Sequence, residues 1–430
     1  MNYFELSTRE LDRELEFLQK KFTEFQSKEI NLDMSRGKPC AEQLILANEM
    51  LSYNINNLNF VDSDILNYGC LEGLYGARMM MSVLMDCEPQ DVIIGGNSSL
   101  CLMSDVIEFF FTIGINGEKW EFGNTKFLAP VPGYDRHFQL SEHFGIELIP
   151  VSMQNDGPDM NLIEDLVEND ENIKGLWCVP KFSNPSGITY SENTIKRLAR
   201  LKPKSKNFRI FWDNAYSVHS FAKNCDINLA NIFDACISNH NQNLVISFCS
   251  TSKMTFAGGG IAAIGCKDLN FKNLLRHYSF KTIGFDKINQ ARHVAFFSDN
   301  QKKFTKQIFL EKINKHMSLH ADILRPKFEL VLEVLDKKFA DNPIISCSSP
   351  KGGYFIIANT FGSAKRTVDL CSQLGLNLTA AGVMFPYKND PRDSTIRIAP
   401  SYPPLEELAM AIEIFSLCVR ISCIEKLLKK

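Results

Sequence analysis

Between about residue 90 and residue 265 the chain alternates short apolar runs with amphipathic stretches, and this alternation is its most constraining feature. The runs are DVIIGG, KFLAPVPG, IELIPVS, GLWCVP, FRIFWDN, LVISFCS and GIAAIGC. Between two of them, SENTIKRLARL has helical spacing, and Ser191 is placed to cap its start. Strands that alternate with helices predict an α/β domain whose sheet is largely parallel.

The C-terminal third has a different pattern. FELVLEVLDKKFA and PLEELAMAIEIFSLCVRI predict helices, whereas KGGYFIIANT and STIRIAPSY predict strands. This mixture indicates a smaller α+β domain, and we expect the N-terminal segment to pack with it. We therefore predict a large α/β domain over residues 60–310 and a small domain formed by residues 1–59 and 311–430.

Length, charge and cysteine use restrict the kind of protein. A chain of 430 residues can bury enough surface for two domains. A net charge of −3 argues against nucleic acid as the main partner. The start, MNYFELSTRELDRELEF, lacks the apolar segment of a signal peptide, and no apolar run reaches the length of a membrane span. The 13 cysteines include no C-x-x-C pair. We expect a cytoplasmic protein with reduced thiols and without a metal site.

Polar residues that could carry chemistry follow the apolar runs, where the carboxyl ends of strands collect ligands in α/β sheets. They are Ser98 and Ser99 in NSSL, Asn184 in KFSNPSG, Asp213 and Tyr216 in DNAY, and Ser250, Ser252 and Lys253 in SFCSTSKMTFAGGG. Taken singly, each has an ordinary explanation as a helix cap, a turn, a core aromatic or a solvated cation. Lys253 is not a P-loop lysine, because its glycines follow it.

Taken together, the motifs resemble those of the fold-type I pyridoxal-phosphate enzymes in the aspartate aminotransferase superfamily, and its type Ic aspartate aminotransferase subgroup in particular. N-P-x-G, D-x-A-Y, S-x-S-K and a late strand arginine occur in that order. The resemblance extends from SRGKP near residue 35 to RIAPSYP near residue 400. It implies a PLP-transferase fold with a large, mostly parallel-sheet domain and a smaller α+β domain, and pyridoxal 5′-phosphate as the cofactor.

The resemblance assigns catalytic roles to three residues. Lys253 would form a Schiff base with the cofactor, because an enclosed, desolvated lysine has a lowered pKa and becomes nucleophilic. Asp213 would pair with the pyridine nitrogen and keep it protonated, so that the ring can act as an electron sink. Tyr216, together with Asn184, would hydrogen-bond the phenolic oxygen of the cofactor.

The remaining matches concern the phosphate, the substrate and a partner subunit. The serines Ser98, Ser99, Ser250 and Ser252 fall at cofactor-binding positions, the first three of them facing the phosphate. Tyr68, in NYGCLEGLYGAR, resembles a tyrosine that reaches the phosphate from the neighbouring subunit, which implies a homodimer with shared active sites. Arg397 matches the arginine that binds the substrate α-carboxylate, and Gly37 a glycine that lets the N-terminal segment close over substrate. Without the other motifs, Arg397 would be interpreted as a strand arginine that reaches solvent.

Two positions depart from the family pattern. Ile261 stands where these enzymes usually have a phosphate-binding arginine, so hydroxyls and helix N-terminal amides, or a base elsewhere, would have to hold the phosphate. Val131 aligns with the aromatic residue that stacks on the cofactor ring. Tyr134, three residues later, is our candidate for that stacking role.

The sequence therefore predicts an aminotransferase that exchanges an amino group between an L-amino acid, aspartate by resemblance, and a 2-oxo acid such as 2-oxoglutarate. Lys281 is a candidate partner of the second substrate carboxylate. Another reaction on the same cofactor, a β-lyase or decarboxylase reaction, stays open as an alternative. A PLP-binding transcriptional regulator is disfavoured, because SRGKP begins only about 35 residues into the chain and leaves no room for a DNA-binding domain.

Overall fold

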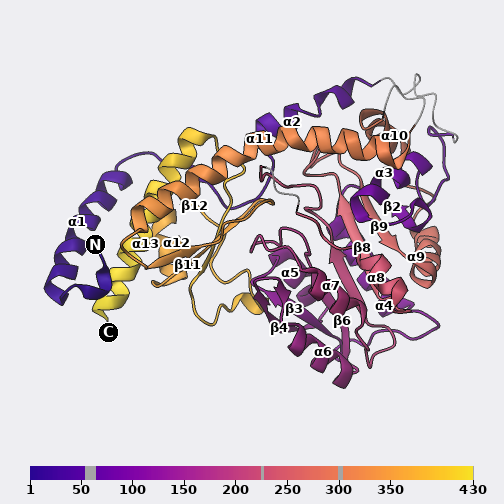
Figure 1. Cartoon of the computed structure of the whole chain (residues 1–430), viewed down its shortest axis with the longest axis horizontal. Coiled ribbons are helices and arrows are strands. Elements are labelled where there is room, and N and C mark those ends of the chain that lie inside the picture. Colours follow the sequence, from indigo (N-terminus) through magenta and orange to yellow (C-terminus); the bar gives the residue numbers. More distant parts are fainter. Residues whose placement is uncertain (54–63, 224–226, 299–303, 430) are drawn as a thin grey trace.

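The computed structural model describes residues 1–53, 64–223, 227–298 and 304–429 (Figure 1). In this part of the chain the largest sheet has eight strands, in the order β2-β9-β8-β7-β6-β3-β4-β5. The strands are β2 (Val92–Ile94), β3 (Lys126–Val131), β4 (Glu147–Gln154), β5 (Gly157–Pro158), β6 (Ile173–Cys178), β7 (Arg209–Asp213), β8 (Val245–Ser250) and β9 (Ala262–Cys266).

The centre of this sheet is parallel. β8, β7, β6, β3 and β4 run in one direction, whereas β9 runs antiparallel to its neighbours β8 and β2, and β5 runs antiparallel to β4. Each predicted apolar run forms one of these strands, and the prediction of an α/β fold with a mostly parallel sheet is confirmed. The runs are apolar throughout because both faces of a sheet of this kind are covered by helices.

Helices cover both faces of the sheet. One face packs against α3 (Tyr75–Met85), α6 (Met160–Asn169), α7 (Glu192–Ala199), α8 (Ile232–Ser238) and α10 (Lys287–Phe296). The other face packs against α4 (Ser99–Thr112), α5 (Asp135–His143) and α9 (Asp268–Lys281). The predicted cap is confirmed at α7, where Ser191 Oγ accepts a hydrogen bond from the Thr194 amide at 3.1 Å.

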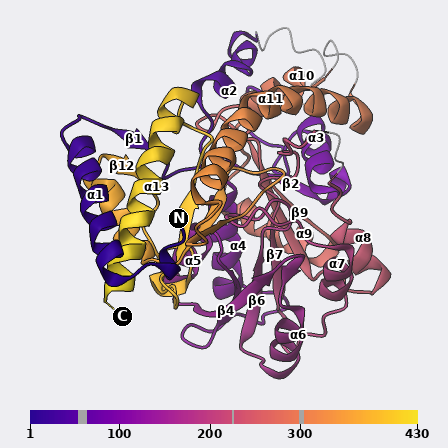
Figure 2. The same ribbon diagram turned by 60° about the vertical axis from the view of Figure 1, so that its left-hand side comes forward.

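A second core forms around the C-terminal third. It contains α1 (Thr8–Gln26), α12 (Ala364–Gln373), α13 (Leu405–Leu428) and an antiparallel sheet of β10 (Ile345–Cys347), β11 (Ile356–Thr360) and β13 (Thr395–Ile398). The N-terminal segment joins this core, because β1 (Leu32–Asp33) pairs with β12 (Leu376–Asn377) and α1 lies beside α13 (Figures 1 and 2). The short elements are α2 (Ala41–Ile45), η1 (Tyr3–Glu5), η2 (Asn48–Ser52), η4 (Pro89–Asp91) and η5 (Pro386–Lys388).

One long helix, α11 (Lys306–Phe339), connects the two cores (Figure 1). Its Phe309 and Ile313 are buried with the large sheet, whereas Leu324 and Phe328 are buried in the second core. The predicted domain boundary at residue 310 falls inside this helix, and the boundary at residues 59 and 60 lies outside the described residues. The division into domains therefore stays a prediction. None of the helices in the described ranges has the length and apolar character needed to span a membrane.

Candidate active site

A cavity of about 270 Å³ lies at the carboxyl ends of the central strands. Its lining contains most of the residues that the sequence singled out: Ser98, Ser99, Tyr134, Asn184, Asp213, Tyr216, Ser250, Ser252 and Lys253. They come from separate strand ends and are brought together by the parallel arrangement of the sheet. Gly37, Tyr68 and Arg397 do not line this cavity.

Lys253 sits in a tight turn directly after β8. Its Nζ lies 4.9 Å from the centre of the Tyr216 ring. Burial lowers the pKa of the Lys253 amine below its ordinary value of 10.5, while the negative charge of Asp213 opposes part of that shift. The amine therefore becomes neutral at a lower pH than a surface lysine would, and it can act as a nucleophile or a base.

A buried histidine of α10 holds the turn that carries Lys253. His293 Nδ1 lies 2.8 Å from the Asn289 carbonyl, which can only accept, so Nδ1 carries the proton. Nε2 is then the acceptor, with the hydroxyls of Thr251 and Thr255 at 3.0 and 3.1 Å sharing its one lone pair. Burial lowers the pKa of His293 to about 4, so this anchor is neutral at ordinary pH.

A second set of buried side chains supports the same turn from α11 and α2. His316 Nε2 donates to the Met254 carbonyl at 2.7 Å, and the Tyr354 hydroxyl donates to the Lys253 carbonyl at 3.5 Å. Gln43 Nε2 donates to His320 Nδ1 and to the Tyr354 hydroxyl, both at 2.9 Å. Gln43 is fully buried, so the N-terminal segment contributes directly to the support of the lysine turn.

Asp213 ends β7 with its carboxylate buried between a histidine and the cavity. Its Oδ2 lies 3.0 Å from His137 Nε2, and the His137 ring stacks on Trp177 with centroids 4.2 Å apart. The other oxygen, Oδ1, is buried and has no hydrogen-bond partner among the residues that the structure describes. A buried carboxylate oxygen without a partner is costly, so this atom is suited to a protonated nitrogen of a ligand in the cavity.

The serines form a group of hydroxyls at the start of α4. Ser98 is its N-cap and accepts from the Cys101 amide at 3.4 Å. Ser252 Oγ donates to the Asn97 carbonyl at 3.0 Å, and Ser250 Oγ lies 2.7 Å from Ser252 Oγ. A helix N-terminus with hydroxyls beside it suits a phosphate or another anion.

Ile261 supplies no charge to that group. Its side chain is buried in the core, and its amide donates to Thr251 Oγ1 at 2.9 Å. Among the described residues that line the cavity, the arginine is Arg136, on the first turn of α5. It was not singled out in the sequence, and neither were its neighbours Asp135 and His137.

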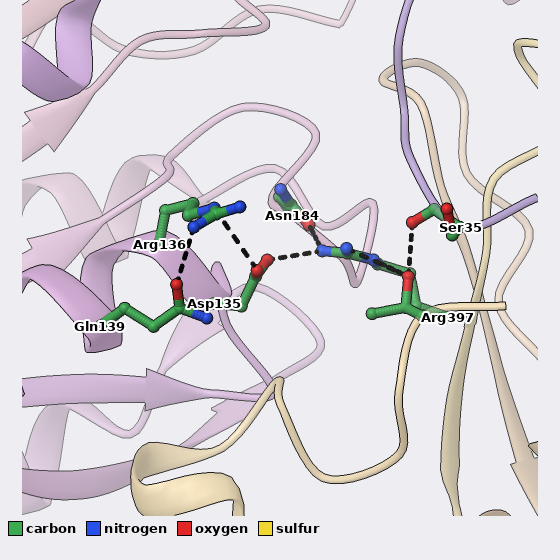
Figure 3. A network of polar contacts seen from close by, with 7 residues as sticks. Ser35, Asp135, Arg136, Gln139, Asn184 and Arg397 are labelled. Atoms are coloured by element: carbon green, nitrogen blue, oxygen red, sulfur yellow. Dashed lines mark hydrogen bonds and ion pairs between the residues drawn. The ribbon is translucent and has the colours of Figure 1, made fainter.

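Arg397 lies beside the cavity and is held by several polar groups (Figure 3). Its Nη1 donates to Asp135 Oδ1 at 3.0 Å and to Asn184 Oδ1 at 3.3 Å. Its Nε and Nη2 donate to Thr379 Oγ1 at 3.3 and 3.2 Å. Asn184 lines the cavity itself and therefore links the arginine to it.

Gly37 packs against an aromatic ring that also contacts this arginine. A Cβ atom at Gly37 would lie 2.5 Å from Cζ of Phe355, whose ring lies 4.6 Å from the Arg397 guanidinium. Only a glycine allows this close approach without displacing the ring.

Two other sequence candidates lie away from the cavity of their own chain. Tyr68 is 82% exposed. Lys281 is bonded to Asp105 Oδ1 and Glu108 Oε2 of α4, at 2.5 and 2.7 Å. The candidate role of Lys281 in binding a substrate carboxylate is not supported by this position, because two carboxylates already neutralise its charge.

One short segment, PGYDRHF, holds residues in or beside the candidate site that the sequence analysis does not single out. Only Tyr134 was taken from it. Asp135, Arg136 and His137 are three consecutive ionisable residues at the start of a helix that follows a buried strand. That pattern was the available signal, because the same strand-end rule had identified Asp213 and Lys253.

Comparisons with known proteins show the family of the chain. The family model described as aspartate amino-transferase matches residues 6–430. An aspartate aminotransferase of Corynebacterium glutamicum is 38% identical over 418 residues, which cover 95% of this chain and 94% of the relative. The crystal structure of an aspartate transaminase from Corynebacterium glutamicum superposes with a TM-score of 0.92 at 36% identity, and the match covers 99% of each chain.

A more distant structure shares the fold. The α-aminoadipate aminotransferase of Thermus thermophilus, complexed with N-(5′-phosphopyridoxyl)-L-leucine, has a TM-score of 0.73 at 20% identity. The match covers 98% of this chain and 96% of that one.

Proposed function

The chain belongs to the aspartate amino-transferase family and is a pyridoxal-phosphate-dependent aminotransferase, and from this premise we propose that aspartate is its amino donor and 2-oxoglutarate its acceptor. The single observation that carries the choice of substrates is the pair of arginines, Arg136 and Arg397, on either side of Asp135. Two cations this close are suited to the two carboxylates of a short dicarboxylic acid.

The residues of the cavity fit the cofactor. The unpaired Asp213 Oδ1 suits a protonated pyridine nitrogen, and the hydroxyls at the start of α4 suit a phosphate. Asn184 and Tyr216 line the same cavity and are the candidates to face the phenolic oxygen. Tyr134 lines it too and stays our candidate for the ring that stacks on the cofactor.

When bound, pyridoxal phosphate carries the amino group between the two substrates and delocalises the charge that develops at the substrate Cα. The other tasks fall to the chain. Lys253, whose amine is made neutral more easily by burial, would take the proton from the substrate Cα and deliver it to the cofactor carbon C4′, so that the amino group can stay on the cofactor. Asp213, oriented by His137, keeps a proton on the nitrogen that faces its Oδ1. Arg397 binds the α-carboxylate and thereby presents the Cα–H bond to Lys253.

We propose that Arg136 binds the second carboxylate of the substrate. Its Nε lies 4.0 Å from Asp135 Oδ2, while Arg397 Nη1 lies 3.0 Å from Asp135 Oδ1. The remaining contact of Arg136 is a neutral one, to Gln139 Oε1 at 2.8 Å. A partly exposed guanidinium with a neutral partner can turn toward an incoming carboxylate without breaking a strong ion pair.

The substrate assignment is tested by steady-state kinetics with a panel of L-amino acids and 2-oxoglutarate. We expect aspartate to have the highest kcat/KM among aspartate, alanine, leucine and phenylalanine. Arg136→Gln should lower kcat/KM for aspartate about a hundredfold, the size expected for losing charge-assisted hydrogen bonds, and leave the value for alanine within about threefold. A preference for alanine or leucine in the unmodified enzyme would overturn the proposal, and equal losses for aspartate and alanine would show that Arg136 has another role.

We also propose that the enzyme is a homodimer with shared active sites and that it works in the cytoplasm. Exposed apolar side chains around Tyr68 support the first point, because a second copy would cover them. The free cysteines among the described residues support the second, since they are typical of a reducing compartment.

A further inference from the structure

The guanidinium of Arg397 has little free capacity for a substrate carboxylate. A carboxylate that binds with both oxygens needs two adjacent N–H groups. The edge formed by Nε and Nη2 is bonded to Thr379 Oγ1. The edge formed by Nη1 and Nη2 is the alternative, but Nη1 already donates to Asp135 and Asn184. An incoming α-carboxylate therefore has to displace groups that already accept hydrogen bonds from Nη1.

One of the groups bonded to Nη1 is a carboxylate, the same functional group that the substrate presents. Asp135 offers a carboxylate oxygen to Nη1 at 3.0 Å, and the two side chains are only 15% and 6% exposed. Asp135 is the first residue of α5, on the large sheet, whereas Arg397 lies on β13 in the second core. The ion pair thus connects the two cores beside the cavity, and Asp135 lies between Arg136 and Arg397 (Figure 3).

We propose that Asp135 is an internal stand-in for the substrate α-carboxylate: it pairs with Arg397 in the ligand-free protein and gives up that place when substrate binds. The inference rests on the proposed role of Arg397 in binding that carboxylate. Substrate binding is then the exchange of one carboxylate for another. Arg397 is never left as an unpaired buried cation, and the affinity for substrate is lowered by the cost of breaking the existing pair.

The opposite role for Asp135 predicts the opposite result. If Asp135 served only to orient Arg397 in the substrate complex, then removing its charge would leave the arginine poorly placed. Substrate affinity would fall. Under the exchange, removing the charge removes a competitor, and substrate affinity rises.

The test uses the PLP-loaded enzyme and Asp135→Asn, which keeps the shape of the side chain and its oxygen acceptor. The probe is maleate, a dicarboxylate that cannot donate an amino group. Its Kd is measured by calorimetry and by the change in visible absorption of the bound cofactor. We expect Kd for maleate and KM for aspartate to fall about tenfold. An unchanged or raised Kd would overturn the proposal.

Glu142→Gln is a matched control. Glu142 lies on the same helix, and its Oε1 accepts from the Tyr387 amide at 3.0 Å, so it too bonds α5 to the C-terminal third of the chain, at η5. The variant loses the same charge without touching Arg397, and its Kd for maleate should stay within about twofold of the unmodified enzyme. A tenfold fall in this control would show that general charge or looser docking of the cores is responsible.

A double-mutant cycle with Arg397→Lys separates this inference from the proposed function. Arg397→Lys should raise Kd for maleate, and in that background Asp135→Asn should no longer lower it. If Arg397→Lys leaves Kd unchanged, the proposed role of Arg397 fails. If Kd rises with Arg397→Lys but Asp135→Asn still acts in full, the exchange alone fails. Should Asp135→Asn fold poorly, Asp135→Ser removes the same charge and keeps a residue that favours a helix start.

Discussion

The chemistry of Lys253 depends on two opposing effects that are visible in its surroundings. Burial disfavours the ammonium form and lowers the pKa, whereas the negative charge of Asp213 favours that form and raises it. Burial is the larger effect. Burial therefore activates the amine, and Asp213 keeps it from losing its proton too readily.

We predict that Asp213→Asn lowers the pKa of Lys253 further in the cofactor-free protein. Removing the negative charge removes the group that stabilises the ammonium, so the amine loses its proton at a lower pH. The midpoint is obtained from the pH dependence of the rate at which pyridoxal phosphate attaches to Lys253, with borohydride trapping and mass spectrometry to identify the site. A midpoint that moves to higher pH would contradict this account of the electrostatics.

Where a motif and a strand end coincide, the sequence singled out residues that the structure places in the cavity lining. Asp213 ends one buried strand, Lys253 follows another, and both line the cavity. The strand-end pattern could have singled out His137 but not its role, because that role depends on a contact with Asp213 that spans 76 residues of sequence. The buried position of Ile261 in the core explains why this residue is apolar. It does not show which residue holds a phosphate instead of the arginine that the family usually has there.

At the scale of elements, the turn that carries Lys253 is supported by α2, α10 and α11. Gln43 of α2 bonds His320 of α11 and Tyr354, and Tyr354 in turn bonds the Lys253 carbonyl. Burial lowers the pKa of His320 to about 3, so the network is neutral. The apolar runs predicted the strands, but no periodicity in the sequence indicates that this short helix supports a turn about two hundred residues away.

We predict that Gln43→Leu lowers the free energy of unfolding by about 1–3 kcal/mol. The substitution removes the hydrogen bonds that Gln43 donates to His320 Nδ1 and to the Tyr354 hydroxyl, and both acceptors stay buried. Denaturant unfolding of the cofactor-free protein measures the change. The control is Glu42→Leu, the same new side chain at the exposed neighbouring position, which should change the free energy by no more than about 0.5 kcal/mol. Equal effects of the two variants would mean that the network adds no stability.

At the scale of the whole molecule, the described chain carries an exposed apolar surface near Tyr68. Leu66, Tyr68, Phe280 and Ile283 are 71%, 82%, 74% and 62% exposed. The two segments that carry them touch, since a Cβ atom at Gly284 would lie 2.4 Å from the Gly69 carbonyl oxygen. A contiguous apolar patch of this kind is typical of an interface, and a second copy of the chain is the partner that we propose.

The trans arrangement of Tyr68 is tested by mixing two inactive variants. Lys253→Ala and Tyr68→Ala should each be poorly active as pure dimers. If Tyr68 completes the site of its partner, then a mixed dimer holds both lesions in one site and an intact second site. Because one site in two is then intact, mixed dimers should regain up to about half of the normal activity per dimer.

If Tyr68 instead served the lysine of its own chain, every site of the mixed dimer would contain one lesion, and mixing would recover nothing. Subunit exchange is verified independently by native mass spectrometry of the two variants, one of them isotopically labelled. Exchange without recovery would rule out the trans arrangement. The exposed position of Tyr68 favours recovery, because a side chain that is 82% exposed and outside the cavity lining of its own chain is free to reach another one.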